Sequence, residues 1–249
     1  MRRVLSARVA AVLAALTLTA CATTPATGTR PSSPASAPVV YAAVGASETY
    51  GIGAGDRYRQ AWPQVFYNDV LPRSAVLYNF GIPGATTAQA LHDEVPAAVA
   101  VHPTVVTVWL NVNDLINGVA AQDYEAQLRQ VLRALRRGGQ ARVLVANTPD
   151  LAQLPAYRAC LPNAPAGGPP CLIPAGFMPT PQAVAAAVAA YNAAISDAVK
   201  LEGATLVDLN LNDSQLSQHP EWISADGFHP STQGYAVIAK QFEDAYRRI

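Results

Sequence analysis

The sequence predicts an α/β domain, a three-layer α/β/α sandwich built around a parallel sheet of about five strands. Short apolar runs without polar alternation recur along the chain, which is typical of strands that are buried on both faces of a sheet. Amphipathic helical patterns separate these runs. The 249 residues are 51% hydrophobic and 14% charged, which is sufficient for one well-buried core.

The first twenty residues have the pattern of an export signal. Arg2, Arg3 and Arg8 precede an apolar run that ends in small residues. Because this run is shorter than the ~20 residues that span a bilayer, a permanent transmembrane helix is disfavoured. The ending Leu-Thr-Ala-Cys resembles a bacterial lipobox, which implies that Cys21 is acylated and becomes the new amino terminus. The alternative is an ordinary secretory signal that is cleaved near Cys21.

Residues 21–38 are rich in Ala, Thr, Pro and Ser and predict a flexible tether to a folded domain over residues 39–249. We therefore expect a lipoprotein held at a membrane, at the cell surface or in the periplasm, or a secreted protein if Cys21 carries no lipid. Removal of residues 1–20 leaves 14 basic and 17 acidic residues, a formal charge of −3. With no basic stripe left, we expect no nucleic acid partner. The domain is expected to be a monomer.

The other two cysteines agree with export. If Cys21 carries lipid, Cys160 and Cys171 remain as a pair in an oxidising compartment, which favours a disulfide over two free buried thiols. They lie in the irregular stretch 150–179, which is too long for an ordinary connection. This stretch is therefore either functional or a disulfide-braced insertion. The wide spacing, without a histidine nearby, argues against a zinc site.

The strands of the sheet are expected where runs rich in Val or Leu occur. Because helical patterns lie between these runs, right-handed crossovers would make the strands parallel. The expected strands span Val39–Val44, Ala75–Phe80, Thr104–Leu110, Ala141–Ala146 and Ala204–Leu209.

Four helices with one apolar face are expected around these strands. Thr86 begins the first, because Gln89 three residues later completes a capping box. Gly138 ends the second, and Thr180-Pro181 begins the third. The apolar stripes are Ala88, Leu91, Val95 and Val99; Tyr124, Leu128, Val131 and Leu135; Val184, Val188, Tyr191, Ile195 and Val199; and Tyr235, Ile238, Phe242 and Tyr246.

Candidate catalytic residues follow the first strand and precede the last helix. The first strand ends in a turn of small residues that holds Ser47. Reactive groups in an open parallel sheet gather beyond the carboxyl ends of the strands, which is where Ser47 is expected. Asp226-Gly-Phe-His229 places a carboxylate within reach of an imidazole, which it would orient as a base. Together these residues predict a nucleophile with its base.

Two further loops offer hydrogen-bond donors for a developing oxyanion. Gly84 lies just before the Thr86 cap, so its N–H can point off a helix amino terminus. Asn113 follows the third strand and brings a side-chain amide. Taken alone, each is better explained as a helix cap or a turn residue. With Ser47 and His229, however, they supply the missing parts of an acyl-transfer site.

Four blocks together resemble the SGNH, or GDSL-type, hydrolases. They are Ser47 in a glycine-rich turn, the N-x-G-x-x-G-x-T pattern that contains Gly84, Asn113 before an Asp, and the terminal D-x-x-H. The resemblance covers about residues 39–249. It implies a flavodoxin-like fold and hydrolysis of esters without metal or cofactor. It also implies roles: Ser47 as nucleophile, His229 as base, Asp226 as its orienting partner, and Ser47, Gly84 and Asn113 as oxyanion donors.

The sequence departs from the family pattern at two places. The first block usually reads Gly-Asp-Ser, but here Ala46 replaces the Asp and Glu48 follows the nucleophile. Asn111 stands where the third block usually has Gly, and this bulkier residue is expected to narrow access to the cleft. Neither departure removes a catalytic group, so both bear on the substrate more than on the reaction.

Two other functions stay open: an exported protein that binds a glycan or lipid without turnover, and an acyltransferase that uses the same residues. Metal binding is not expected, because His92, His102 and His219 lack ligand spacing. The insertion is expected either to form an apolar wall for an acyl chain or to bury its own side chains on the sheet. The residues concerned are Leu154, Tyr157, Leu161, Leu172, Ile173, Phe177 and Met178.

Overall fold

The computed structural model describes residues 38–164, 166–171, 178–210, 216 and 218–249. The predicted export signal at 1–20, the lipidation site Cys21 and the predicted tether up to residue 37 lie outside the described residues. Three apolar residues of the insertion, Leu172, Ile173 and Phe177, also lie outside them.

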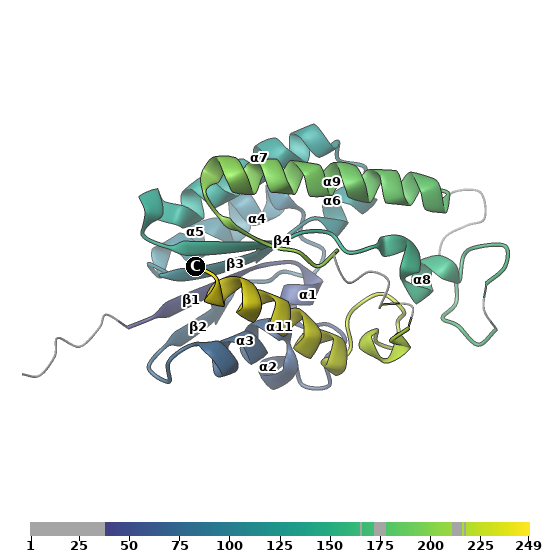
Figure 1. Ribbon diagram of the computed structural model, residues 1–249, viewed down its shortest axis with the longest axis horizontal. Helices are drawn as coiled ribbons and strands as arrows, with labels where there is room; N and C mark the ends of the chain where they lie inside the picture. The colour runs from purple at the N-terminus through teal and green to yellow at the C-terminus, as the bar shows by residue number, and fades with distance from the viewer. Residues whose placement is uncertain (1–37, 165, 172–177, 211–215, 217) are drawn as a thin grey trace, which may run out of the picture. The chain divides into compact units, whose positions relative to one another are not determined.

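The described residues form an α/β sandwich around a five-stranded sheet of order β2-β1-β3-β4-β5, with every pair of neighbouring strands parallel (Figure 1). This confirms the predicted fold class and the five strands. Gly45 at the end of β1 pairs with Trp109 at the end of β3, so the two strands end at the same level. The strands are β1 (Val40–Gly45), β2 (Val76–Asn79), β3 (Val105–Trp109), β4 (Arg142–Ala146) and β5 (Thr205–Val207).

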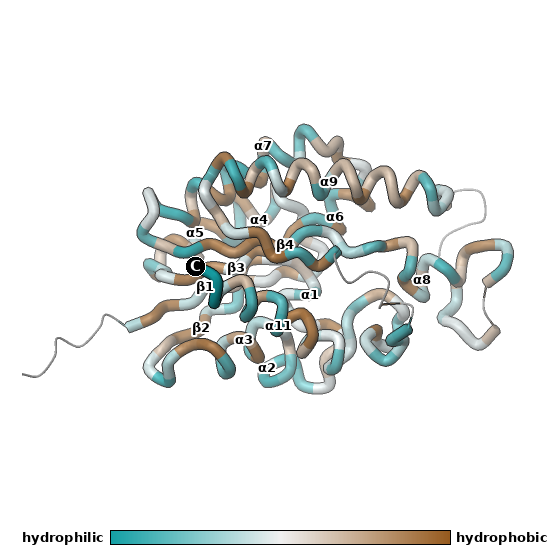
Figure 2. The backbone as a smooth tube through the Cα atoms, viewed as in Figure 1, coloured by the Kyte–Doolittle hydropathy of each residue, from teal (hydrophilic) through white to brown (hydrophobic). Residues whose placement is uncertain are grey.

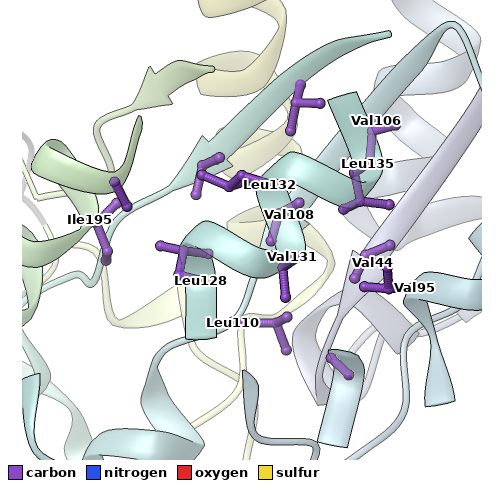
Figure 3. Packing of buried hydrophobic residues seen from close by; sticks show 14 of the residues in the cluster. Val44, Val95, Val106, Val108, Leu110, Leu128, Val131, Leu132, Leu135 and Ile195 are labelled. Atoms are coloured by element: carbon purple, nitrogen blue, oxygen red, sulfur yellow. The ribbon is translucent and has the colours of Figure 1, made fainter. Parts of the chain in front are cut away.

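Helices cover both faces of the sheet, because alternate strand residues point to opposite sides. On one face, Ala42 and Val44 of β1 join the cluster that is shown in part in Figure 3. Hydrophobic residues follow the central strands in Figure 2, as expected for a sheet buried on both sides. The helices that pack on this first face are α4 (Thr87–Asp93), α5 (Val95–Ala100), α7 (Ala121–Arg136) and α9 (Pro181–Glu202).

The opposite face carries α3 (Trp62–Val70) and α11 (Thr232–Arg247), which pack on Tyr41 and Ala43 of β1. The ring of Trp62 stacks on that of Phe242 with centroids 4.1 Å apart. The helix α3 was not expected from the sequence, because its apolar stripe is short and Pro63 is the one start signal at its beginning. The remaining short elements are α1 (Ser47–Tyr50), α2 (Arg57–Gln60), α6 (Val112–Ile116), η1 (Arg137–Gly139), η2 (Leu151–Gln153), α8 (Pro155–Arg158) and η3 (Pro220–Trp222).

One predicted helix is wrong in its extent. The capping box of Thr86 and Gln89 is present, but the helix breaks at Glu94 into α4 and α5. Pro96 lies in the first turn of α5, where a missing N–H is tolerated, whereas inside one continuous helix it would remove a hydrogen bond. Ala88 of the predicted stripe is exposed, and Thr87 and Ala90 are the buried residues of α4 instead.

The predicted disulfide is present: Cys160 and Cys171 are bonded in the insertion between β4 and α9. Leu151 and Leu154 at the start of this insertion pack against Val184 and Val188 of α9. At least this part of the insertion therefore buries its own side chains. By length and composition α9 is the one described helix that would pass as a membrane span, yet its apolar stripe is part of the core.

Candidate active site

The nucleophile candidate lies directly beyond the sheet. β1 ends at Gly45, Ala46 caps the next turn, and Ser47 is the first residue of α1. The end of the strand is held in place by Glu94, whose Oε2 accepts a hydrogen bond of 2.8 Å from the Gly45 N–H. Burial raises the pKa of Glu94 to about 8. Ser47 itself is 7% exposed, so its hydroxyl lies in a recess and not on a convex surface.

The predicted ion pair of Asp226 and His229 is formed. Asp226 Oδ2 lies 2.6 Å from His229 Nδ1, and the imidazole is 17% exposed. The other oxygen, Oδ1, accepts hydrogen bonds from the Ser224 hydroxyl at 2.7 Å and from the Phe228 N–H at 2.8 Å. Burial raises the pKa of Asp226, but these hydrogen bonds outweigh it and lower the pKa to about 2. The carboxylate is therefore ionised at neutral pH and fixes the orientation of the ring.

The histidine loop contacts the turn that follows Ser47. Tyr235, in the first turn of α11, donates its hydroxyl hydrogen to the carbonyl oxygen of Ile52 at 2.5 Å. Gly53 has a φ of +93°, and a Cβ there would overlap the carbonyl oxygen of Pro230, next to His229. Only glycine permits this close approach. Tyr235 and Ile52 are 183 residues apart in the sequence, so the tertiary fold joins two distant segments of the chain here.

In the free protein the Ser47 hydroxyl is directed to its neighbour in sequence. Ser47 Oγ donates a hydrogen bond of 3.3 Å to Glu48 Oε2. Within the described residues, no hydrogen bond joins Ser47 to His229. Catalytic hydrogen bonds of free enzymes are often long and tighten when substrate binds, so the two side chains stay candidates for a nucleophile and its base.

The two expected oxyanion loops are tied to one another. The Asn113 side-chain amide donates to the carbonyl oxygen of Ala85 at 3.0 Å. The buried carboxylate of Asp114 accepts hydrogen bonds from the N–H of Thr87 at 2.9 Å and from its hydroxyl at 3.0 Å. Gly84 has a φ of +83°, and no atom lies within 4 Å of where its Cβ would be. The Gly84 turn therefore has open space at this position.

The same loop is also attached to the nucleophile strand, because the Ile82 N–H donates to the carbonyl oxygen of Gly45 at 2.9 Å. The backbone N–H groups of Ser47 and Gly84 donate to no acceptor among the described residues. Both are thus available to a ligand, as an oxyanion site requires.

The side chain of Asn111 makes a hydrogen bond inside the fold. Its side chain is 3% exposed, and its amide donates to the carbonyl oxygen of Ala146 at 3.3 Å, which ties the end of β3 to the end of β4. Asn111 therefore supports the floor of the site.

A cavity of about 110 Å³ lies beside the candidate site, and the sequence analysis did not locate it. Its wall includes Glu48, next to Ser47, and Phe228 and Pro230 on either side of His229. Among the described residues of the expected acyl wall, Leu154 lines this cavity. Glu48 is the ionisable side chain among the described lining residues. The others are Trp109, Val112, Pro149, Leu151, Leu209, Leu216, Trp222, Ile223, Gly234, Val237, Ile238 and Gln241.

The described residues contain no group of three or more His, Cys, Asp or Glu side chains that could hold a metal ion. The histidines outside the site each have another neighbour. His92 contacts Asp93, His102 contacts Arg137, and His219 contacts Glu221.

Comparisons with known proteins show a family and a shared fold. The model of the GDSL-like lipase/acylhydrolase family matches residues 43–237. Among solved structures the chain is similar to TesA, with 18% identity over 84% of this chain and 98% of that one and a TM-score of 0.60. It is similar to the psychrotrophic esterase EstA from Pseudoalteromonas sp. (15% identity, 84% and 97% covered, TM-score 0.59). It is also similar to a lipase/acylhydrolase from Enterococcus faecalis, with 18% identity over 83% of this chain and 94% of that one and a TM-score of 0.57. A comparison with curated protein sequences found no match.

Proposed function

The chain belongs to the GDSL-like lipase/acylhydrolase family, and from this premise we propose that it is a serine esterase that hydrolyses carboxylic esters through an acyl-enzyme. One observation carries the proposal. The loops of Gly84 and Asn113 are hydrogen-bonded to each other and to the end of β1 before Ser47, and the turn after Ser47 contacts the segment that carries the Asp226–His229 pair. The set contains a nucleophile, an oriented base and donors for an oxyanion, which is what acyl transfer requires.

The reaction proceeds in two steps. Ser47 Oγ attacks the ester carbonyl carbon while its proton passes to His229, and the carbonyl oxygen becomes an oxyanion held by the free N–H groups of Ser47 and Gly84 and by the Asn113 amide. When this intermediate collapses, the bond to the alcohol breaks and His229 returns the proton to the leaving oxygen. Water then repeats the sequence on the acyl-enzyme and releases the acid. Asp226 keeps the imidazole in the tautomer that can accept a proton.

Covalent labelling tests this proposal directly. A fluorophosphonate probe is expected to react once per chain, and mass spectrometry of the peptides is expected to find the adduct on Ser47. The similar esterase EstA was solved in a form described as inhibited by monoethylphosphonate, a related reagent. An intact protein that neither reacts at Ser47 nor hydrolyses p-nitrophenyl acetate would instead support a binding protein on the same fold.

The cavity predicts the preferred acyl chain. If it holds the acyl chain, each methylene buried there would contribute about 0.8 kcal/mol, so kcat/KM would rise by up to about fourfold per carbon from acetate to hexanoate. Leu154→Phe narrows the cavity and is expected to lower kcat/KM for hexanoate about tenfold while changing that for acetate about twofold or less. Leu201→Phe, on the exposed side of α9, is the matched control. A wild-type enzyme that acts on acetate alone would refute this use of the cavity.

The proposal includes an exported location with a lipid on Cys21. The bonded pair Cys160–Cys171 supports the exported location, because disulfides persist in oxidising compartments. An acyltransferase would use the same residues with an alcohol in place of water. Product analysis in the presence of glycerol or a sugar separates the two reactions, since a transferase yields a new ester.

A further inference from the structure

Glu48 is a buried carboxyl group that the reaction above does not use. It follows the nucleophile in sequence and is 7% exposed. Its Oε2 lies 3.3 Å from Ser47 Oγ. Glu48 also lines the cavity, whose other described lining side chains are mostly apolar or aromatic and include Trp109 and Trp222. A charged group in such surroundings is costly unless an opposite charge lies close to it.

The ionisable groups around Glu48 come from the loop before α11 and from α11 itself. Burial raises the pKa of Glu48, whereas His229 and the Ser47 hydroxyl lower it and Asp226 raises it further. Burial raises the pKa of Tyr235 on α11, and the negative charge of Glu48 raises it further. Tyr235 therefore stays uncharged. No Lys or Arg is among the described residues that line the cavity. Among the described groups, His229 is the one whose positive charge would lower the pKa of Glu48.

We propose that Glu48 is a positioning residue of the catalytic pair: it holds the Ser47 hydroxyl in the free enzyme and, as a carboxylate, stabilises the imidazolium that forms on His229. The inference rests on the proposed function. During attack the Ser47 proton moves to His229, so the ring carries a positive charge, with the Asp226 carboxylate at its Nδ1 and Glu48 next to the nucleophile. Glu48 neither takes nor gives a proton in this step, and its contribution is electrostatic.

This role has two opposite consequences, because the coupling of the two charges is reciprocal. A carboxylate at Glu48 stabilises the imidazolium in the transition state and so raises kcat. The same charge also favours the protonated imidazole in the free enzyme, which is inactive, and so moves the acid limb of the rate profile to higher pH. A residue that only packs the core would change the rate without moving the acid limb.

Replacement of the carboxyl group tests the inference. In Glu48→Gln, which keeps the size and a hydrogen-bond acceptor, we expect the midpoint of the acid limb of kcat/KM to fall by about 0.5 to 1 pH unit. The plateau kcat is expected to fall about tenfold, with KM changed less than about twofold. Glu48→Asp keeps the charge and is expected to restore the wild-type midpoint in part. Asp123→Asn, which removes an exposed carboxylate on α7, is the control and should leave both values unchanged.

The outcomes separate this inference from the proposed function. If the wild-type protein is labelled at Ser47 and Glu48→Gln, folded by near-ultraviolet circular dichroism, keeps the wild-type midpoint, the role of Glu48 is overturned and the esterase stands. If the wild-type protein is not labelled at all, both are overturned. Because a buried substitution can prevent folding, the labelling rate of Glu48→Asp is measured over the same pH range. An acid limb in Glu48→Asp that moves below that of a folded Glu48→Gln would also contradict the inference.

Discussion

Ser47→Ala is expected to lower the rate of ester hydrolysis by about 10⁴-fold or more and to abolish labelling by a fluorophosphonate. The substitution removes one oxygen atom, whose hydrogen bond in the free protein goes to Glu48. Without Oγ no covalent intermediate forms, and the residual rate comes from the oxyanion donors acting on water. kcat for p-nitrophenyl acetate, with the background rate subtracted, measures the effect.

The fold of this variant should be unchanged. Alanine fits the start of α1, and the donor that is lost is a side-chain oxygen and not a backbone group. Ser74→Ala, on an exposed turn before β2, removes the same atom far from the sheet edge and should keep full activity. Wild-type rates in Ser47→Ala with the control also active would mean that another group performs the attack.

Asp226→Asn is expected to lower kcat by about 10² to 10⁴-fold. The carboxylate oxygen that lies 2.6 Å from His229 Nδ1 can only accept, so the ring carries its hydrogen on that nitrogen and leaves the other free to take the Ser47 proton. An amide nitrogen at this place would donate instead and would reverse the tautomer. Asp69→Asn on the exposed side of α3 is the matched control.

The Asp226 carboxylate also makes the free energy of unfolding depend on pH. Its pKa falls from the ordinary 3.8 to about 2 in the folded protein, so its contribution to the free energy of unfolding is present above about pH 4 and is lost as the pH falls through about 2. Urea unfolding of the wild type at pH 5 and pH 3 should show this loss, and in Asp226→Asn it should be smaller. An equal pH dependence in both proteins would show that the carboxylate is not held as the structure describes.

Much of the fold could be predicted from local sequence patterns. Four of the five strands lie within the expected runs and β1 extends one residue beyond its run, to Gly45, because central strands that are buried on both faces are rich in apolar residues. The helices α7, α9 and α11 also follow their predicted stripes. The pattern failed where the chain packs short elements, as with α3, whose burial depends on Phe242 far along the chain.

The sequence by itself determined the fold class, the parallel sheet, the disulfide and the set of groups from which the candidate site is made, since strand composition, cysteine count and motif spacing are local properties. Only the tertiary structure decided where Glu48 points and what surrounds it. Trp109, Leu154 and Phe228, from three other parts of the chain, line the same cavity as Glu48. Burial, and with it the charge of a carboxyl group, depends on such distant neighbours, and no pattern along the chain records them.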